Sequence, residues 1–338
     1  IAVRNNNVFS SAGSGWTQIN VSQYGVPRVN GGSQSGGTLN VDGLLNTEGT
    51  KTLIPQVGDT FTIASVALVY TVTTKPTVNA AGESAIAISP NLNSSPSDDA
   101  VITFLTAAKV NAATNINRFS KYRIGTTEKI AGVDGTNYPF TYDGTTYTPL
   151  TGAPDDVLGA SHTASYKNQL FFAKGDVLTF TAPYTDNDFD AGNGAGNISV
   201  GSNITGLIAF RDQLIIFSEN KIDKLVGNTI ADFVLQPVTR NIGCIDSDTI
   251  KEVAGDVVFL GPDGIRSLSG SDKVGDFDLA VISKTIQKEV TDVISSNDSF
   301  MSVTIKNKSQ YRLLGFNSNI SDSAATGIIG TQLAGPQG

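Results

Sequence analysis

Short apolar runs separated by polar turns recur through the second half of the chain. The segments SYKNQLFF (165–172), AFRDQLII (209–216) and VAGDVVFL (253–260) align so that Asn168, Asp212 and Asp256 fall 44 residues apart. In each segment an apolar run follows the polar residue, and then a second polar turn and another short apolar run. Each unit is therefore predicted to be strand, tight turn, strand, tight turn, strand.

A period near 44 residues with several strands per unit is typical of β-propeller blades. One small sheet cannot bury both of its faces, whereas blades packed side by side cover one another and leave only short edges. A degenerate copy lies at 128–150, with the turn dipeptides Asp134-Gly135 and Asp143-Gly144, and another lies at 302–316. We therefore predict an all-β protein with a β-propeller-like domain over residues 105–316. Closure of a ring is expected to need the N-terminal strands or a partner chain.

Residues 52–104 are predicted to form a small inserted β domain. The segments VGDTFTIA (57–64) and ALVYTVTT (67–74) alternate apolar and polar residues and are expected to pair as a hairpin. The segments 84–90 and 99–104 would add two more strands. Before them, residues 28–50 are rich in Gly, Ser, Asn and Thr, which indicates loop. Residues 1–51 are thus expected to hold N-terminal strands and this loop, and residues 317–338 a polar C-terminal tail without a closing strand.

One stretch, at 276–296, has a helical period instead of a strand period. Apolar residues recur there at intervals of three and four, at Leu279, Ile282, Ile286, Val290 and Val293. This single apolar stripe predicts an amphipathic helix over 278–295, with Asp278 as its N-cap. The stripe is expected to pack onto the propeller, and docking on another subunit is the alternative.

Composition and charge argue against several classes of function. Of the 338 residues only 16% are charged, and the formal net charge is −8, with no basic run. Phosphate binding needs clustered Lys and Arg, so a nucleic-acid groove is disfavoured. No run of about 18 apolar residues occurs, so no membrane span is expected.

The chain has one cysteine, Cys244, and one histidine, His162. No disulfide can form within the chain, and a zinc site of the usual ligand types is nearly excluded. Cys244 with His162 is the only candidate nucleophile–base pair, and a Ser-His-Asp triad would also need His162. No G-x-S-x-G turn surrounds any serine. The favoured interpretation of Cys244 is a small buried apolar side chain.

The segment YTDNDFDAGNGAGN (184–197) carries alternating carboxylates at Asp186, Asp188 and Asp190. They match positions one, three and five of a calcium loop, but position six is Ala191 and position twelve is Asn197, where the loop needs Gly and Glu. A glycosidase needs two carboxylates facing each other across a sugar, which alternate positions on a turn do not indicate. The favoured interpretation is a long connection between blades that serves as an interface loop, anchored by Phe189. No residue is assigned a catalytic, cofactor-binding or metal-binding role, and no cofactor is expected.

Residues 182–250, together with GDVVFLGPDGIRSL (255–268), resemble a family of tailed-bacteriophage structural proteins. The family comprises tail nozzle and tail-hub-like β-propeller proteins, several of them from cyanophages. The run GLIAFRDQLIIF into IGCIDSDTI and FLGPDGIR is the specific part, and the resemblance covers roughly residues 160–290. The strands of the insert also look like a small β module of phage virion proteins.

The resemblance implies a non-enzymatic component of the virion tail that forms a homo-oligomer with other tail or neck proteins as partners. For a nozzle it implies a six-fold ring through which phage DNA passes without specific binding, and an acidic lumen would suit that passage by repulsion. A neck, baseplate or fibre-attachment protein that contacts receptor glycan is the alternative. A glycan-cleaving propeller enzyme is a further alternative.

Overall fold

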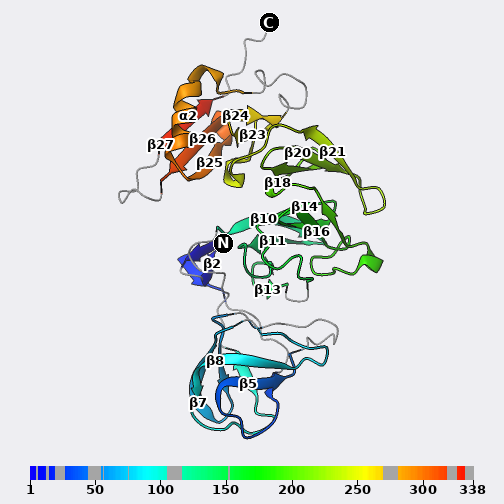
Figure 1. Cartoon of the computed structure of the whole chain (residues 1–338), viewed down its shortest axis with the longest axis vertical. Helices are drawn as coiled ribbons and strands as arrows, with labels where there is room; N and C mark the ends of the chain where they lie inside the picture. Colours follow the sequence, from blue (N-terminus) through cyan, green and yellow to red (C-terminus); the bar gives the residue numbers. More distant parts are fainter. Residues whose placement is uncertain are drawn as a thin grey trace. The chain divides into compact units, whose positions relative to one another are not determined.

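The chain is an all-β protein with a β-propeller-like core of small antiparallel sheets (Figure 1). The computed structural model describes residues 1–4, 7–12, 15–19, 27–44, 55, 57–74, 76–104, 116–150, 153–268, 281–317 and 326–331. It forms two compact units, one of Ile1–Lys174 with Thr179–Gly196 and one of Gly175–Leu178 with Asn197–Gly338. Among these residues no helix has the length and apolar character needed to cross a bilayer.

The first unit contains two sheets made of consecutive strands, and the larger of them is buried on both of its faces. A three-stranded sheet contains β1 (Ala2–Arg4), β2 (Asn7–Ala12) and β3 (Gly15–Gln18). A four-stranded sheet follows, with β10 (Arg118–Ile124), β11 (Thr127–Val133), β12 (Phe140–Tyr142) and β13 (Tyr147–Pro149). Val8 packs with Phe140 and Tyr147, whereas Tyr122 and Ala131 belong to another buried cluster with Phe172. The four-stranded sheet is therefore covered on both sides, as a propeller blade must be.

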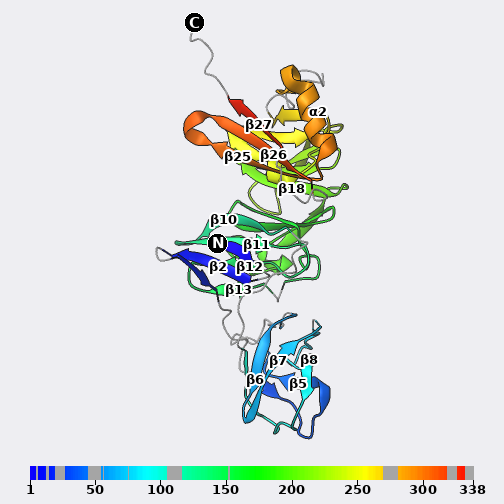
Figure 2. The same cartoon turned by 90° about the vertical axis from the view of Figure 1, so that its left-hand side faces the viewer.

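The insert is a separate sheet with its own core (Figures 1 and 2). Its order is β4-β5-β8-β7-β6-β9, with β4 (Arg28–Val29), β5 (Gly36–Asp42), β6 (Thr60–Ile63), β7 (Val66–Val72), β8 (Ser84–Leu92) and β9 (Ile102–Phe104). The predicted hairpin is confirmed, since Phe61 pairs with Tyr70 across β6 and β7. The prediction of loop over 28–50 is wrong at β4 and β5. Leu39 and Val41 alternate there and are fully buried, a short strand signal that the surrounding Gly and Thr residues concealed.

A four-stranded sheet made of β14 (His162–Tyr166), β15 (Gln169–Lys174), β16 (Val177–Phe180) and β17 (Gly196–Ser199) comes next along the chain. The second unit then contains a four-stranded sheet of β18 (Ile204–Phe210), β19 (Gln213–Ser218), β20 (Ile222–Val226) and β21 (Val234–Thr239). Two three-stranded sheets follow, one of β22 (Lys251–Val253), β23 (Asp256–Gly261) and β24 (Gly264–Ser267), the other of β25 (Ser299–Ile305), β26 (Gln310–Phe316) and β27 (Thr326–Thr331).

Strand β23 shows how the middle sheet of the second unit is buried on both sides. Val257 and Phe259 point to one side, where the Phe259 ring lies 5.1 Å from that of Phe217. Val258 and Leu260 point to the other side, into a cluster with Leu313 of the last sheet. Every residue of β23 after the first is buried, which explains why the sequence VVFL is apolar at consecutive positions.

The hairpin turns of the repeat confirm the predicted strands but shift one of them by a residue. Lys167-Asn168 and Arg211-Asp212 have positive φ at both residues, as two-residue type I′ hairpins require. In the third unit the residues with positive φ are Ala254 and Gly255, and Asp256 is the first residue of β23. Asp256 therefore corresponds to Gln169 and Gln213, and its alignment with Asn168 is wrong by one position. Either Asp or Gly suits such a turn, so composition alone did not fix the register.

The predicted helix begins later than its apolar stripe indicated. A 3-10 turn at Lys284–Ile286 leads into α2 (Gln287–Ser296), with Val290 and Val293 buried. Residues 278–280, including the predicted N-cap Asp278, lie outside the described residues. The prediction is wrong at 281–283, where Val281 bridges to Arg266 and the Ile282 amide donates to the Ile265 carbonyl at 2.9 Å. Pairing with β24 takes the backbone bonds that a first helical turn would have used.

The predicted polar tail also contains a strand. β27 pairs antiparallel with β26, with Ile328 opposite Leu313 and Thr331 opposite Gln310. Its only apolar side chains are Ile328 and Ile329, so its period-2 signal was too short to recognise.

Candidate functional site

The carboxylates of the 184–197 loop make separate bonds and do not converge on one point. The Asp186 carboxylate accepts hydrogen bonds from the Tyr122 hydroxyl at 2.8 Å and from Lys129 Nζ at 2.6 Å. The Asp188 carboxylate accepts from the backbone of Asp190 and from the Asn193 amide, both at 2.9 Å. In the described ranges no group of three His, Cys, Asp or Glu side chains is placed to hold a metal ion.

The rest of the loop is built from its own turns. Asp190 caps a 3-10 turn at Ala191–Asn193 by accepting from the Gly192 amide, and Gly194 ends that turn at φ 95°. The Phe189 ring lies 6.2 Å from the Phe172 ring and packs against the cluster of the first unit. The predicted anchor role of Phe189 is confirmed. The prediction that this loop connects two blades is wrong, because it joins β16 to β17 within one four-stranded sheet. Tyr184 is 72% exposed at the start of the loop.

His162 is held as a neutral, buried side chain. Its Nδ1 lies 2.8 Å from the Ser161 hydroxyl, and the Ser161 carbonyl accepts from Arg118 at 3.5 Å. Burial lowers the pKa of His162 to about 3, with the Arg118 charge as a second cause. Such an imidazole is a poor general base at neutral pH, because a group with so low a pKa has little affinity for the proton that it would have to accept.

Cys244 is a buried thiol within the second unit. Its sulfur lies 3.2 Å from the Asp246 carbonyl oxygen and 3.7 Å from the Thr249 hydroxyl. Burial raises the pKa of the Cys244 thiol to about 12, so the nucleophilic thiolate is scarce at neutral pH. The favoured prediction of a small buried side chain is confirmed for this residue.

The terminal sheet provides the candidate functional surface. The sequence predicted strands at 302–316 but did not indicate this surface. Alternate residues of β25, β26 and β27 face away from the core cluster, and the register places Val303 opposite Arg312 and Arg312 opposite Ile329. We call this the outer face; it consists of Met301, Val303, Ile305, Arg312, Leu314, Phe316 and Ile329. Met301, Val303 and Ile329 are 41%, 45% and 59% exposed.

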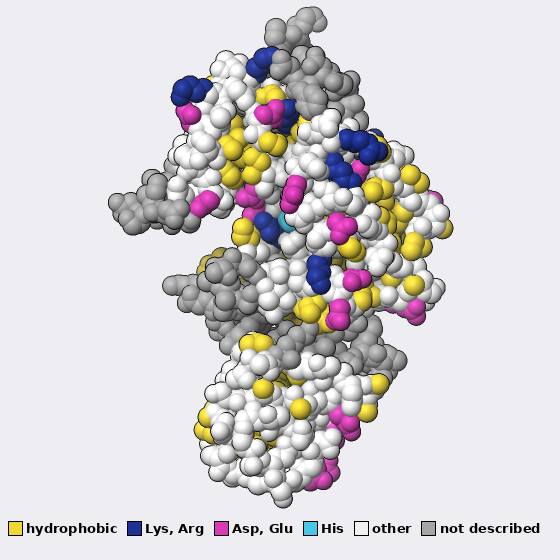
Figure 3. All heavy atoms as spheres, in the orientation of Figure 1, with side chains coloured by type: hydrophobic (Ala, Val, Ile, Leu, Met, Phe, Trp, Pro, Cys, Tyr) yellow, Lys and Arg dark blue, Asp and Glu magenta, His cyan; other side chains and the backbone are white. Residues whose placement is uncertain are grey.

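Hydrophobic side chains also gather on the surface over β24, β25 and β26 in the space-filling view (Figure 3). Contiguous apolar surface of this kind marks places where proteins contact other molecules.

The sequence signal for the outer face was the alternation of Met301, Val303 and Ile305 on β25. It became interpretable only once β27 was known to extend the sheet.

No protein-family model and no curated protein matches the chain. Among solved structures, a quinonprotein alcohol dehydrogenase-like protein from Bacteroides thetaiotaomicron aligns at 11% identity over 91% of this chain and 73% of its own, with a TM-score of 0.41. Hsv2p from Kluyveromyces lactis aligns at 10% identity over 92% and 97% of the two chains, with a TM-score of 0.33. AztD from Citrobacter koseri aligns at 13% identity over 86% and 79%, with a TM-score of 0.30. Likenesses this distant assign neither a ligand nor an activity to this chain.

Proposed function

We propose that this chain is a non-catalytic structural protein of a bacteriophage tail, which joins tail parts through protein–protein contacts. The observation that carries the proposal is the exposed apolar outer face of the terminal sheet. In a propeller each blade face is covered by the next blade, so a terminal face with Met301, Val303 and Ile329 exposed calls for a partner. A second copy of the chain is the partner expected for the homo-oligomer.

The states of the chemically capable side chains favour a scaffold over the glycan-cleaving alternative. His162 is neutral and buried, and Cys244 is a buried thiol with a raised pKa. Asp186 is bound to Lys129 and Tyr122, while Asp188 and Asp190 organise turns. All three carboxylates thus have structural partners within the protein.

The resemblance of residues 182–250 and 255–268 to phage tail nozzle and hub-like proteins supports the choice of the tail. In the nozzle form, copies would assemble into a six-fold ring that lets phage DNA pass without specific binding. A neck, baseplate or fibre-attachment role with contact to receptor glycan remains the second candidate within the same structural class.

Immunogold labelling of intact phage particles with an antibody against this chain tests the proposal. Label at the tail tip is the expected result, and label at the neck or along fibres would transfer the chain to the second candidate. If no particle is labelled and the protein is found free in the lysate, the virion proposal is wrong.

The outer face has its own test in solution. Replacing Ile329 by Asp puts a charge on that face, at the edge strand β27, and is expected to lower the oligomeric mass measured by light scattering. Val69→Asp, at a residue 49% exposed on β7 of the insert, is the matched control and should leave the mass unchanged.

A further inference from the structure

The terminal sheet has an open edge at β27. In the sheets β10–β13, β14–β17 and β18–β21 a fourth strand follows the third, whereas in the described ranges β27 ends its sheet as the third strand. Strand β27 has the sequence TGIIGT and carries no Lys, Pro or acidic residue. Natural proteins use those residues to protect edge strands from pairing with other chains. The sequence of β27 therefore leaves its backbone edge unprotected against pairing with another strand.

The neighbouring sheet provides an instructive contrast, because its edge is covered. Val281 bridges to Arg266 of β24, the Ile282 amide donates to the Ile265 carbonyl, and the Ile265 amide donates to the Ser283 hydroxyl at 3.1 Å. The segment 281–283 therefore occupies the position of a fourth strand beside β24. Among the described residues nothing equivalent lies beside β27.

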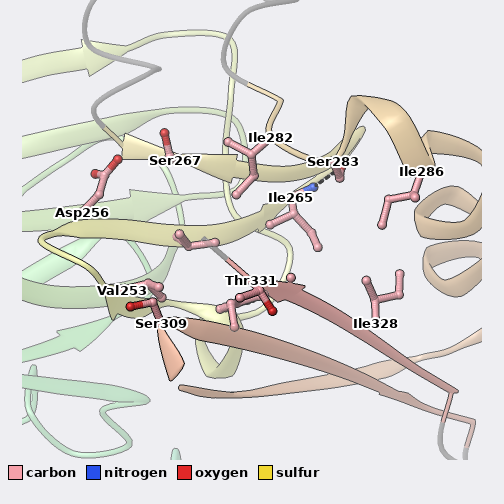
Figure 4. A pocket seen from close by; sticks show the side chains of 13 residues that line it. Val253, Asp256, Ile265, Ser267, Ile282, Ser283, Ile286, Ser309, Ile328 and Thr331 are labelled. Carbon is pink, nitrogen blue, oxygen red and sulfur yellow. Dashed lines mark hydrogen bonds between the residues drawn. The ribbon is translucent and has the colours of Figure 1, made fainter. Parts of the chain in front are cut away.

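A cavity of about 400 Å³ lies next to this edge, between β24 and β27 (Figure 4). Its apolar wall includes Ile265, Ile282, Ile286 and Ile328, which point into the same space from β24, from the segment before α2 and from β27. Ile282 is 57% exposed, so the mouth of the cavity presents aliphatic surface to the outside. The volume falls within the range of about 300–1,000 Å³ that is usual for ligand sites.

We propose that β27 and this cavity capture an extended strand of another protein. The incoming strand pairs with the open edge of β27 through main-chain hydrogen bonds, and its alternate side chains, branched aliphatic in chemistry, fill the cavity. Recognition by strand addition combines these two elements, with the edge giving affinity and the cavity giving selectivity for side chains. The position that it fills is the fourth strand of the blade.

Charge favours an acidic partner strand over a second copy of β27. The turn Lys306–Lys308 adjoins the end of β27, since Gln310 pairs with Thr331, and both lysines are exposed. Asp256 also lines the cavity, but its carboxylate accepts from the Val257 amide at 2.8 Å. A strand with a carboxylate beside Thr331 would pair with the two lysines, whereas TGIIGT has no carboxylate to offer.

This inference deepens the proposed function by naming the kind of contact, and it rests on that function only for the source of the partner, another tail protein. The two fail separately. Loss of label on phage particles leaves strand capture by the purified chain untouched, and loss of strand capture leaves the label in place.

The test uses fluorescein-labelled peptides and the full chain. The probe EEVTISVT places aliphatic residues at alternate positions behind two glutamates, and the control EETSTVIV has the same composition with the alternation removed. We expect the probe to bind at least tenfold more tightly by fluorescence anisotropy. Hydrogen–deuterium exchange of the amides at 326–331 should slow at least tenfold when the probe saturates the chain.

Two variants of similar exposure locate the site. Ile282→Asp, at the cavity mouth, should weaken probe binding at least tenfold, while Val69→Asp, on β7 of the insert and 49% exposed, should change it less than twofold. Replacing Lys306 and Lys308 together by Glu should weaken binding several-fold, more at low salt than at high salt.

Equal affinity for the two peptides, no binding of either, or unprotected amides in β27 would overturn the proposal. So would an equal effect of Ile282→Asp and Val69→Asp. If the amides at 326–331 become protected with rising protein concentration and no peptide, a second copy occupies the edge, and an acidic partner strand is the wrong occupant.

Discussion

The hydroxyl of Tyr122 on β10 and the carboxylate of Asp186 in the 184–197 loop are joined by a 2.8 Å hydrogen bond. Lys129 on β11 completes the group with a 2.6 Å ion pair to the same carboxylate oxygen, and both ionic side chains are less than one-third exposed. Burial and the neighbouring Asp186 charge raise the pKa of Tyr122, so its proton stays in place to be donated. This carboxylate fastens a long loop to the blade that precedes it.

Asp186→Ala should therefore destabilise the protein by about 1–3 kcal/mol, because it leaves a part-buried hydroxyl and ammonium without their acceptor. The partly buried turn residue Asp188 is the matched control, and Asp188→Ala should cost less than about 1 kcal/mol. Urea unfolding of the variants gives both values. Equal costs at the two positions, or a rise in stability with added calcium that Asp188→Ala abolishes, would contradict this account and favour a calcium loop.

His162 predicts a specific dependence of stability on pH. Its pKa is lowered from 6.5 to about 3 in the folded protein, so between these values the unfolded chain binds a proton that the folded chain does not. The free energy of unfolding should therefore fall as the pH decreases through that window, with a slope that grows from about half of 1.4 kcal/mol per pH unit at pH 6.5 towards the full value below about pH 5.5. Urea titrations between about pH 5.5 and 6.5 isolate the effect, because most carboxylates remain ionised there.

His162→Gln is the control for this dependence. It removes the only histidine, so the slope over the same window should flatten even if the overall stability of the variant is lower. A wild-type protein with a flat stability profile would show that the imidazole is protonated in the folded state as well. In that case His162 would regain its candidacy as a general base.

The blades could be predicted from the sequence because their signals are local. Apolar runs such as Leu214-Ile215-Ile216 and the Arg211-Asp212 turn specify strand and hairpin within a few residues. The role of β27 could not be predicted in this way, since Ile328 and Ile329 acquire meaning only through pairing with β26. The predicted start of the helix was wrong for the same reason. The Ile282 amide donates its hydrogen bond to the carbonyl of Ile265, which lies 17 positions earlier in the chain.

The candidate site was harder to predict than the fold. The alternating aspartates were the most conspicuous chemical pattern in the sequence, and the structure uses all three carboxylates to shape and fasten one loop. The open edge and the outer face contain no chemically conspicuous residue. Exposed apolar side chains look the same in sequence as buried ones, so only the sheet order distinguishes Ile329 from Leu313.

Cys244 should be inert towards thiol reagents while the protein is folded. Its pKa is raised to about 12 by burial, and the thiol is covered by the cluster between β19 and β23. Reaction with Ellman's reagent at neutral pH should proceed only as fast as the chain opens, and should become rapid and stoichiometric in concentrated urea. Fast reaction of one equivalent in the native protein would mean that Cys244 is an accessible thiolate, and the nucleophile hypothesis would return.

The turn between β22 and β23 allows the register of the repeat to be tested energetically. Ala254 has φ 48° and Gly255 has φ 80°, so both lie in the left-handed region, where a side chain with a Cβ is strained by about 1–2 kcal/mol. Gly255→Val should destabilise the protein by about that amount, although a Cβ there would meet only Arg211 Nη2, at 3.7 Å.

Ala254→Asn should be neutral or stabilising, because Asn tolerates this conformation and occupies the second position of the equivalent turn as Asn168. The control is Asp256→Val, at a residue outside the turn. The alignment of Asp256 with Asn168 would instead place Asp256 in the turn and would predict a cost in stability for this change. If urea unfolding shows Asp256→Val to be as costly as Gly255→Val, the turn lies one residue later than the structure places it.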